Sequence, residues 1–447
     1  MKIKIVPGSV TTPKGFMASG VFCDIKRLGT GKGSDKGHKR DLALIVSEAP
    51  AALAGMFTTN QVCAAPVKLC LARIGQGRAR AIVVNSGNAN ACTGKQGMQD
   101  ALDMAAFAEQ ALDLPRGSAL VGSTGRIGVP LPMDNVRAGI IEAAVELGSS
   151  AAHAAQAAEA IMTSDTRAKQ IAVEFKLSGR TVRLGGICKG AGMIQPGMSA
   201  NAARPAARPL HATMLCFLTT DAAIQSAALR ATLREAVALS FNRITVDGDM
   251  STNDTVLVLA NGLAGNPPVR INAKGRAKAP GPARSLFQAA LNQVCLELAK
   301  MIVRDGEGVS RFVTVRVRGA RSAAEADAAA RAVANSALVK TSWHGGDPNW
   351  GRIIDALGYS RAKVIEEKVD IGYSAPGAPR IVWSLKQGQP TRTSFEALCA
   401  AVAGKEFDLH INLNIGPAGA LMYAADLTEE YVEFNKGDVN DPASLGG

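Results

Sequence analysis

Short apolar runs alternate with alanine-rich amphipathic stretches along most of the chain. The apolar runs predict buried strands at 41–47, 81–85, 170–175, 180–187, 213–220, 255–260 and 311–318. Stretches with helical spacing predict helices at 99–113, 134–162, 222–239, 284–304 and 322–336. This alternation predicts a mixed, mainly antiparallel α/β layering of helices on sheets.

Individual capping, breaking and turn residues refine the bounds of these elements. Asp134 is a candidate N-cap, and Gly148 is a candidate break in the helical stretch that follows it. The sequence Ser-Gly-Arg at 178–180 predicts a tight hairpin between two strands. Residues 199–212, SANAARPAARPLHA, have no usable period and predict a flexible, exposed linker.

The composition narrows the class of protein. A chain of 447 residues, 47% of them hydrophobic and only 4% aromatic, predicts two or three domains with an aliphatic core. The net charge of +12 is spread along the chain. The densest basic stretch, Lys26–Arg40, lacks aromatic residues that could stack on bases. A solvated loop, or attraction of anionic substrates, is favoured over nucleic-acid binding.

The cysteines and the N-terminus indicate where the protein acts. The eight cysteines form no CxxC pair and show no metal-ligand spacing, so we expect reduced, mostly buried thiols. The start MKIKIVPGS has no apolar signal region, and no run reaches the roughly 18 apolar residues of a membrane helix. We expect a cytoplasmic protein without a membrane segment.

Several stretches imitate functional motifs. Residues 29–37, GTGKGSDKG, lack the GxxxxGK[ST] spacing of a phosphate-binding loop. Residues 247–254, DGDMSTND, lack the glycine and glutamate that complete a calcium loop, so a polar turn with local side-chain bonds is favoured. The five histidines show no HxxxH pair, and we expect no metal site.

Stronger signals come from turns rich in glycine and hydroxyl residues after apolar runs. Residues 85–94 are NSGNANACTG and residues 122–128 are GSTGRIG. Such turns expose backbone N–H groups beside hydroxyls, as an oxyanion site requires, although each alone is more often a simple tight turn. Lys189 begins another glycine-rich turn, where it could approach a carboxylate. Thr213 stands between the linker and an apolar strand, a position suited to chain cleavage.

Taken together and in order, the motifs resemble the glutamate N-acetyltransferase/ornithine acetyltransferase family of arginine biosynthesis, the bifunctional ArgJ type. The resemblance covers nearly the whole chain. The matching stretches are TPKGFMASG, NSGNANACTG, GSTGRIG, MTSDT, KGAGMI, ATML, SFNRITVDGDMSTNDT, RDGEG, HGGDPNWGRI and EEYVEFN. It implies the α/β layered mixed-sheet fold shared with self-processing aminopeptidases, with a smaller C-terminal region.

The resemblance also implies self-cleavage between Ala212 and Thr213. The products would be an α chain, residues 1–212, and a β chain, residues 213–447, assembled as α2β2. The freed Thr213 would be the nucleophile and its α-amine the base, because a hydroxyl is a poor nucleophile without one. Its acetyl ester would carry acetyl from N-acetylornithine to glutamate. The resemblance implies no cofactor and leaves open whether acetyl-CoA also serves as donor.

Residue roles follow from the same resemblance. Thr124 and Gly125 would stabilise the oxyanion. Substrate contacts are implied for Thr163, Lys189, Thr213, Glu307, Asn435 and Asn440. By charge, Lys189 suits a substrate α-carboxylate, and Glu307 suits an ornithine ammonium group or proton transfer. The alternative for either residue alone is a surface ion pair.

The chain departs from the family pattern at three places. The segment between Lys189 and Thr213 is longer than usual, Arg126 replaces an aliphatic residue, and the chain continues past Asn435 as KGDVNDPASLGG. A diverged N-terminal-threonine acyltransferase or amidohydrolase acting on another amino acid is therefore the alternative enzyme. A cleaved but inactive assembly subunit is the non-enzymatic alternative. The presence of Thr213, Lys189 and Glu307 argues against the latter.

Overall fold

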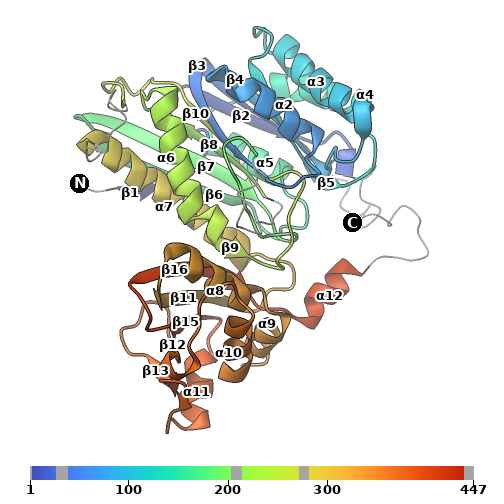
Figure 1. Ribbon diagram of the computed structural model, residues 1–447. Coiled ribbons are helices and arrows are strands. Elements are labelled where there is room, and N and C mark those ends of the chain that lie inside the picture. Colours follow the sequence, from blue (N-terminus) through green and yellow to red (C-terminus); the bar gives the residue numbers. More distant parts are fainter. Residues whose placement is uncertain (1–2, 27–38, 203–213, 271–280, 437–447) are drawn as a thin grey trace. The chain divides into compact units, whose positions relative to one another are not determined.

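The computed structural model describes residues 3–26, 39–202, 214–270 and 281–436 (Figure 1). They form two compact units. The first contains the described residues up to Asn242 and the segment Met250–Ile302. The second contains Arg243–Asp249 and Val303–Lys436. The mixed α/β layering and the smaller C-terminal region predicted from the sequence are confirmed.

The first unit is built on a nine-stranded mixed sheet. Its strands are β1 (Lys4–Val6), β2 (Phe16–Val21), β3 (Leu42–Phe57), β4 (Arg78–Asn88), β5 (Ala119–Arg126), β6 (Lys169–Leu177), β7 (Arg180–Lys189), β8 (Leu215–Thr220) and β10 (Thr255–Ala260). The order is β1-β6-β7-β8-β10-β3-β4-β5, with β2 beside β3. The pairs β8–β10 and β4–β5 are parallel, and the other pairs are antiparallel.

The predicted hairpin joins β6 to β7. Ser178 and Gly179 both have positive φ, 49° and 83°. Two such residues form the turn type whose twist matches that of the flanking strands. The hairpin prediction is confirmed.

Strand β3 runs ten residues beyond the predicted strand 41–47. Glu48-Ala49-Pro50 resembles a strand end, because proline cannot donate a ladder hydrogen bond. In the structure, the pairing of β3 with β4 is irregular between Val46 and Ala51. Pro50 lies inside that irregularity, so the strand continues past it.

Helices α2 (Ala65–Ile74), α3 (Gly94–Ala111), α4 (Met133–Val145) and α5 (Ala151–Ala160) pack against β2–β5. The predicted break at Gly148 is confirmed, since Gly148 lies between α4 and α5 and pairs with Ala18 instead. The predicted N-cap is wrong. The cap position of α4 is Pro132, and Asp134 lies inside the first turn, where its charge favours the helix N-terminus.

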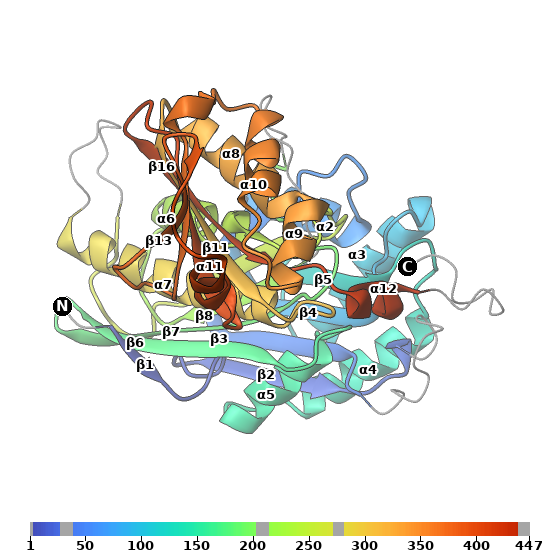
Figure 2. The same cartoon turned by 90° about the horizontal axis from the view of Figure 1, so that it is seen from below.

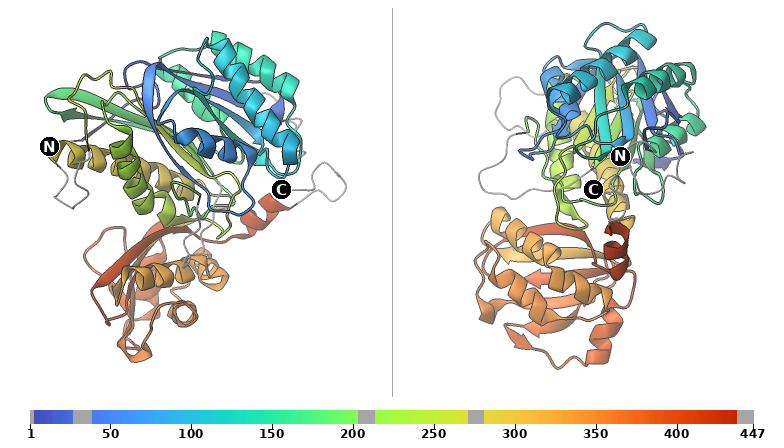
Figure 3. Two further views of the ribbon diagram at one scale, coloured as in Figure 1. Left: turned by 45° about the horizontal axis from the view of Figure 1, so that its top comes forward. Right: turned by 90° about the vertical axis from the view of Figure 1, so that its right-hand side faces the viewer.

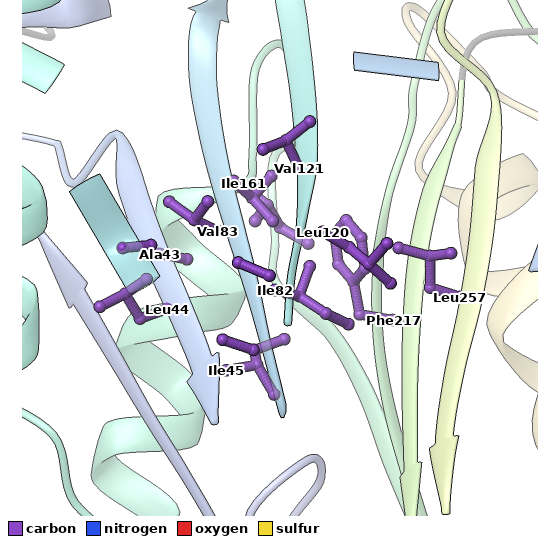
Figure 4. Packing of buried hydrophobic residues seen from close by; sticks show 14 of the residues in the cluster. Ala43, Leu44, Ile45, Ile82, Val83, Leu120, Val121, Ile161, Phe217 and Leu257 are labelled. Carbon is purple, nitrogen blue, oxygen red and sulfur yellow. The ribbon is translucent and has the colours of Figure 1, made fainter. Parts of the chain in front are cut away.

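The hydrophobic core of the first unit includes side chains from strands that are not neighbours in the sheet. Phe217 of β8 and Leu257 of β10 belong to the same buried cluster as Ile82 of β4 and Leu120 of β5. Figure 4 shows these four side chains pointing toward one another. This packing places the far strands β7 and β8 within reach of the end of β5.

Two helices complete the first unit, α6 (Ser226–Leu239) and α7 (Pro282–Arg304). They lie side by side (Figure 3), and Gln288 Nε2 donates to the Thr232 carbonyl over 2.9 Å. By length and composition alone, α7 resembles a membrane span, although polar and charged residues interrupt its apolar positions. Because 61% of that apolar window is buried inside the protein, it is a core helix.

The second unit has a seven-stranded mixed sheet. Its order is β14-β13-β12-β15-β11-β16-β9, formed by β9 (Ile244–Thr245), β11 (Phe312–Ala320), β12 (Asp370–Ser374), β13 (Val382–Lys386), β14 (Gln389–Pro390), β15 (Glu406–Asn412) and β16 (Ala418–Ala425). Figure 2 shows three helices together on one side of this sheet, α8 (Ala323–Asn335), α9 (Ala337–His344) and α10 (Trp350–Gly358). The remaining helices are α11 (Phe395–Val402) and α12 (Glu429–Asn435).

The predicted linker 199–212 is only partly described. Ser199 is anchored, because its N–H donates to the Phe57 carbonyl and its carbonyl accepts from the Phe57 N–H, each over 2.9 Å. The linker prediction is therefore wrong for its first residue. Residues 203–212, like the predicted basic loop 29–37, lie outside the described residues.

Candidate active site

Two of the motif turns meet at one edge of the first sheet. NSGNANACTG begins near the end of β4, and GSTGRIG contains the end of β5. Because β4 and β5 are parallel neighbours, their ends lie together. Ser86 is paired with Thr124, and Gly87 with Gly125. The sheet therefore brings the two motifs into direct backbone contact.

Gly125 has to be glycine. Its φ is +129°, which side chains of L-residues rarely adopt. A Cβ atom built on it would lie 2.3 Å from the Gly87 carbonyl carbon. The preceding residue, Thr124, is 1% exposed. The turn thus holds a buried hydroxyl next to a backbone that approaches its neighbour unusually closely.

Lys189, at the end of β7, is also buried, with 2% of its surface exposed. Its Nζ donates to Thr124 Oγ1 over 3.3 Å. Since the ammonium occupies a lone pair of the hydroxyl oxygen, the hydroxyl hydrogen is available to another acceptor. The cation also favours negative charge near the hydroxyl.

Asp165 connects Lys189 to Thr163. Its Oδ1 accepts from Lys169 Nζ over 2.5 Å and from the Gly190 N–H over 2.7 Å. Its Oδ2 accepts from the Thr163 N–H over 3.1 Å. One buried carboxylate therefore fixes the turn after Lys189 and the backbone of Thr163.

This carboxylate stays charged despite its burial. Burial by itself raises the pKa of Asp165. Lys169 and Lys189, with the hydrogen bonds from Lys169 and Gly190, outweigh burial and lower the pKa to about 2. The polar centre beneath the turn thus contains two buried ammonium groups and one buried carboxylate.

The expected nucleophile and cleavage site fall outside the described residues. Ala212 and Thr213 directly precede Met214, where the description resumes. Met214 N–H donates to Asp254 Oδ1 over 2.5 Å. Immediately after Met214, Leu215 is the cross-strand partner of both Lys189 and Thr255. The start of β8 therefore lies in the same row of the sheet as Lys189.

Glu307 and Asn435 lie in the second unit and contact each other. Asn435 Nδ2 donates to Glu307 Oε2 over 2.9 Å. Asn435 is the last residue of α12, whose N-cap is Thr428. Thr428 Oγ1 also donates to the Gly308 carbonyl over 2.7 Å, which ties α12 to the loop of Glu307.

The structure thus gathers the predicted residues in two sets. Thr124, Gly125, Lys189 and, through Asp165, Thr163 lie together in the first unit. Glu307 and Asn435 lie together in the second unit. Asn440 is not among the described residues. Arg126 is half-buried, and its carbonyl accepts from the Ala89 N–H over 2.9 Å.

Sequence reasoning missed four buried polar residues. They are Asp165, Lys169, Asn253 and Asp254. Three of them stand in stretches that carried the family resemblance, MTSDT and SFNRITVDGDMSTNDT. The available signal was an acidic or amide residue among hydroxyl residues, close to an apolar strand. In the part of the chain that the structure describes, no three His, Cys, Asp or Glu side chains could hold a metal ion.

A buried hydroxyl polarised by an ammonium group, on a glycine turn, suits an enzyme that stabilises an oxyanion during acyl transfer. The comparisons with known proteins identify the family. The ArgJ family model matches residues 19–437. The chain therefore belongs to the ArgJ family, which confirms the resemblance seen in its motifs.

Individual relatives match over nearly their full lengths. The chain is 47% identical over 429 residues to the arginine biosynthesis bifunctional protein ArgJ of Symbiobacterium thermophilum, covering 96% of this chain and 98% of that protein. It is 43% identical over 440 residues to the glutamate N-acetyltransferase of Methanocaldococcus jannaschii, covering 97% and 99%. A crystal structure of ornithine acetyltransferase complexed with ornithine, from Mycobacterium tuberculosis, is 38% identical, with coverage of 44% and 100% and a TM-score of 0.40.

Proposed function

We propose that this protein is an acetyltransferase of arginine biosynthesis that moves acetyl from N-acetylornithine to glutamate. Membership of the ArgJ family and the names of its relatives support this activity. At the level of residues, the observation that carries it is the buried hydrogen bond between Lys189 and Thr124. Lys189 lies opposite Leu215, the first residue of β8. No cofactor is needed for the steps proposed below.

The reaction has two acyl transfers. Thr213 Oγ attacks the acetyl carbonyl carbon of N-acetylornithine while the α-amine of Thr213 accepts the hydroxyl proton. The C–N bond then breaks, and that proton leaves with the ornithine amine. In the second transfer, the glutamate amine attacks the acetyl ester, the C–O bond breaks, and a proton returns to Thr213 Oγ.

Thr124 and Gly125 would hold the oxyanion in both transfers. The Thr124 hydroxyl hydrogen is available because Lys189 occupies its oxygen. The ammonium group of Lys189 would also stabilise the developing negative charge in this buried place, where electrostatic interactions are strong. We assign the α-carboxylate of the substrate to the positive charge of Lys189, with Thr163 beside it.

We assign further substrate contacts to Glu307 and Asn435. Their mutual hydrogen bond presents a carboxylate and an amide side by side on the second unit. A carboxylate suits the side-chain ammonium of ornithine, whereas glutamate would use the amide. We assign the remaining substrate contact to Asn440.

The nucleophile would be produced by self-cleavage between Ala212 and Thr213, leaving an α chain of residues 1–212 and a β chain of residues 213–447. The α-amine freed by the cut has an unperturbed pKa of about 7.7–8.0, which suits a base near neutral pH. We further propose an α2β2 assembly. The eight unpaired cysteines support action in the cytoplasm.

The test is an acetyl-transfer assay with two donors. Purified protein with N-acetylornithine and glutamate should form equal amounts of ornithine and N-acetylglutamate. A second reaction with acetyl-CoA and glutamate decides whether acetyl-CoA is also a donor. Thr213→Ala is the negative control. Failure to form N-acetylglutamate from N-acetylornithine, in protein that is fully cleaved, would refute the proposed activity.

A further inference from the structure

Two consecutive buried residues precede strand β10 and contact both halves of the proposed catalytic machinery. Asn253 is 2% exposed and Asp254 is fully buried. Neither residue was assigned a role from the sequence. The Asn253 side chain holds two backbone carbonyls, and the Asp254 side chain holds one backbone N–H.

Asn253 holds the oxyanion turn. Its Nδ2 donates to the Ser123 carbonyl over 2.8 Å and to the Ala89 carbonyl over 2.6 Å. Its Oδ1 accepts from Thr252 Oγ1, so both ends of the amide are used. Because a peptide unit is planar, fixing the Ser123 carbonyl also fixes the orientation of the Thr124 N–H.

Asp254 holds the beginning of β8. Its Oδ1 accepts from the Met214 N–H over 2.5 Å, and the next residue, Thr255, donates its N–H to the Met214 carbonyl over 3.0 Å. The Met214 N–H belongs to the peptide unit that joins Met214 to Thr213. Asp254 therefore holds the first described backbone N–H of this segment, one residue after the proposed nucleophile in the sequence.

We propose that Asn253 and Asp254 are positioning residues that together set the separation between the oxyanion turn and the nucleophile-bearing end of β8. The inference rests on the proposed function, which gives these two ends their roles. A dipeptide is well suited to this task, because adjacent residues are linked by a rigid peptide and have little freedom to drift apart.

The chemical state of Asp254 is consistent with a positioning role. Its Oδ2 has no hydrogen-bond partner among the residues that the structure describes. Burial raises the pKa of this carboxyl well above its usual value, against smaller opposing effects of the Met214 N–H and Lys189. In either protonation state, Oδ1 can accept the Met214 hydrogen bond, as the oxygen of an asparagine side chain would.

After the proposed cleavage, the Asn253 contact would also join the two chains. Ser123 and Ala89 would belong to the α chain, and Asn253 to the β chain. By contrast, Asp254 and Met214 would both belong to the β chain. The dipeptide would thus hold the start of the β8 segment within its own chain and align the oxyanion turn of the other chain with it.

The first test compares Asn253→Ala with Asn266→Ala. Asn266 is a matched control, because its Nδ2 also donates to two carbonyls, those of Ala223 and Pro267, and its Oδ1 also accepts a hydrogen bond. Both variants should lose similar thermal stability. Only Asn253→Ala should lose turnover, roughly tenfold to a hundredfold, since misplacement of about 1 Å can cost a hundredfold. Its KM should stay within about twofold of the wild-type value, as for an interaction made only in the transition state.

The second test uses two substitutions of Asp254. Asp254→Asn keeps an oxygen that can accept from Met214, whereas Asp254→Ala removes it. We expect Asp254→Asn to cleave itself and turn over at nearly the wild-type rate, and Asp254→Ala to be strongly impaired in both. Asp221→Asn is the control for replacing a buried carboxyl, since Asp221 accepts backbone N–H groups of Lys14 and Arg183.

Two results would overturn the inference. One is equal turnover in Asn253→Ala and Asn266→Ala. The other is a loss in Asp254→Asn as deep as in Asp254→Ala, which would show that an ionised carboxylate is required. If the wild-type protein transfers no acetyl to glutamate, the proposed function fails. The inference is then decided by the rate of self-cleavage, which needs no substrate and is followed by intact mass.

Discussion

The buried carboxylate of Asp165 should control the stability of the first unit. Asp165→Asn removes a charge that faces Lys169, whose side chain is 1% exposed. Breaking a buried ion pair by removing one partner costs about 3–5 kcal/mol, because the other charge stays buried without compensation. An asparagine can still accept from Gly190. We therefore expect a loss near the lower end, about 3 kcal/mol at pH 7.

The pH dependence provides a second, independent magnitude. The pKa of Asp165 falls from its usual 3.8 to about 2 in the folded protein. A depression of nearly two units corresponds to about 2.5 kcal/mol of folded-state stability. Because the folded pKa is lowered, this contribution is present above pH 4 and is lost as the pH falls through about 2. The difference between wild type and Asp165→Asn should shrink over that interval.

The assay is urea unfolding at pH 7, 4, 3 and 2.5. Trp343, Trp350, Trp383 and all four tyrosines lie in the second unit. Fluorescence therefore reports on that unit alone, and the first unit has to be followed by far-UV circular dichroism. Asp370→Asn, which removes a carboxylate bonded to Lys386 in the second unit, should instead shift the fluorescence transition. Equal stability of wild type and Asp165→Asn at pH 7, or a difference unchanged between pH 4 and 2.5, would refute this reasoning.

Three further predictions concern processing and turnover. Intact-mass analysis of active protein should show two chains, the second beginning at Thr213, and Thr213→Ala should remain uncut and inactive; active protein consisting only of the full-length chain would contradict this. Thr124→Ala should lower kcat about a hundredfold to a thousandfold with little change in substrate affinity, and a defect mainly in affinity would move Thr124 from catalysis to binding. Deleting 203–210, which spares the anchored Ser199, should change the rate of self-cleavage but leave transacetylation by fully processed enzyme nearly unchanged; altered acceptor preference in that material would place the insertion at the substrate site.

Local patterns predicted the elements whose signals are local. The strand at 255–260 has the predicted bounds, and the hairpin around Gly179 follows from two residues with positive φ. The continuation of β3 past Pro50 was not predictable in this way, because it depends on where the partner strand β4 becomes irregular. The N-cap at Asp134 failed because sequence preference does not distinguish a cap from the first turn.

The candidate site also divides into residues that local motifs predict and residues whose roles depend on tertiary contacts. Thr124, Gly125 and Lys189 were predicted because family motifs mark them, and the structure places them together. Asp165 and Asp254 were missed because the contacts that link them to the candidate site are distant in the chain: Asp165 bonds to Gly190 and Asp254 to Met214. Those contacts exist only once β7, β8 and β10 lie side by side, and hydrophobic periodicity does not determine strand order.

The strand order has a consequence for the order of folding and cleavage and for refolding of the enzyme. Strands β8 and β10 lie between β7 and β3, so the proposed cut would leave two strands of one product wedged inside the sheet of the other. An α chain made alone would leave the edges of β7 and β3 unpaired in the middle of its sheet, and unpaired strand edges promote aggregation. Under this proposal, folding would precede cutting, and the cut would be irreversible. If a cleaved molecule unfolded, it would lack the covalent connection that guides β8 into the sheet, and the cell would have to replace the enzyme rather than refold it.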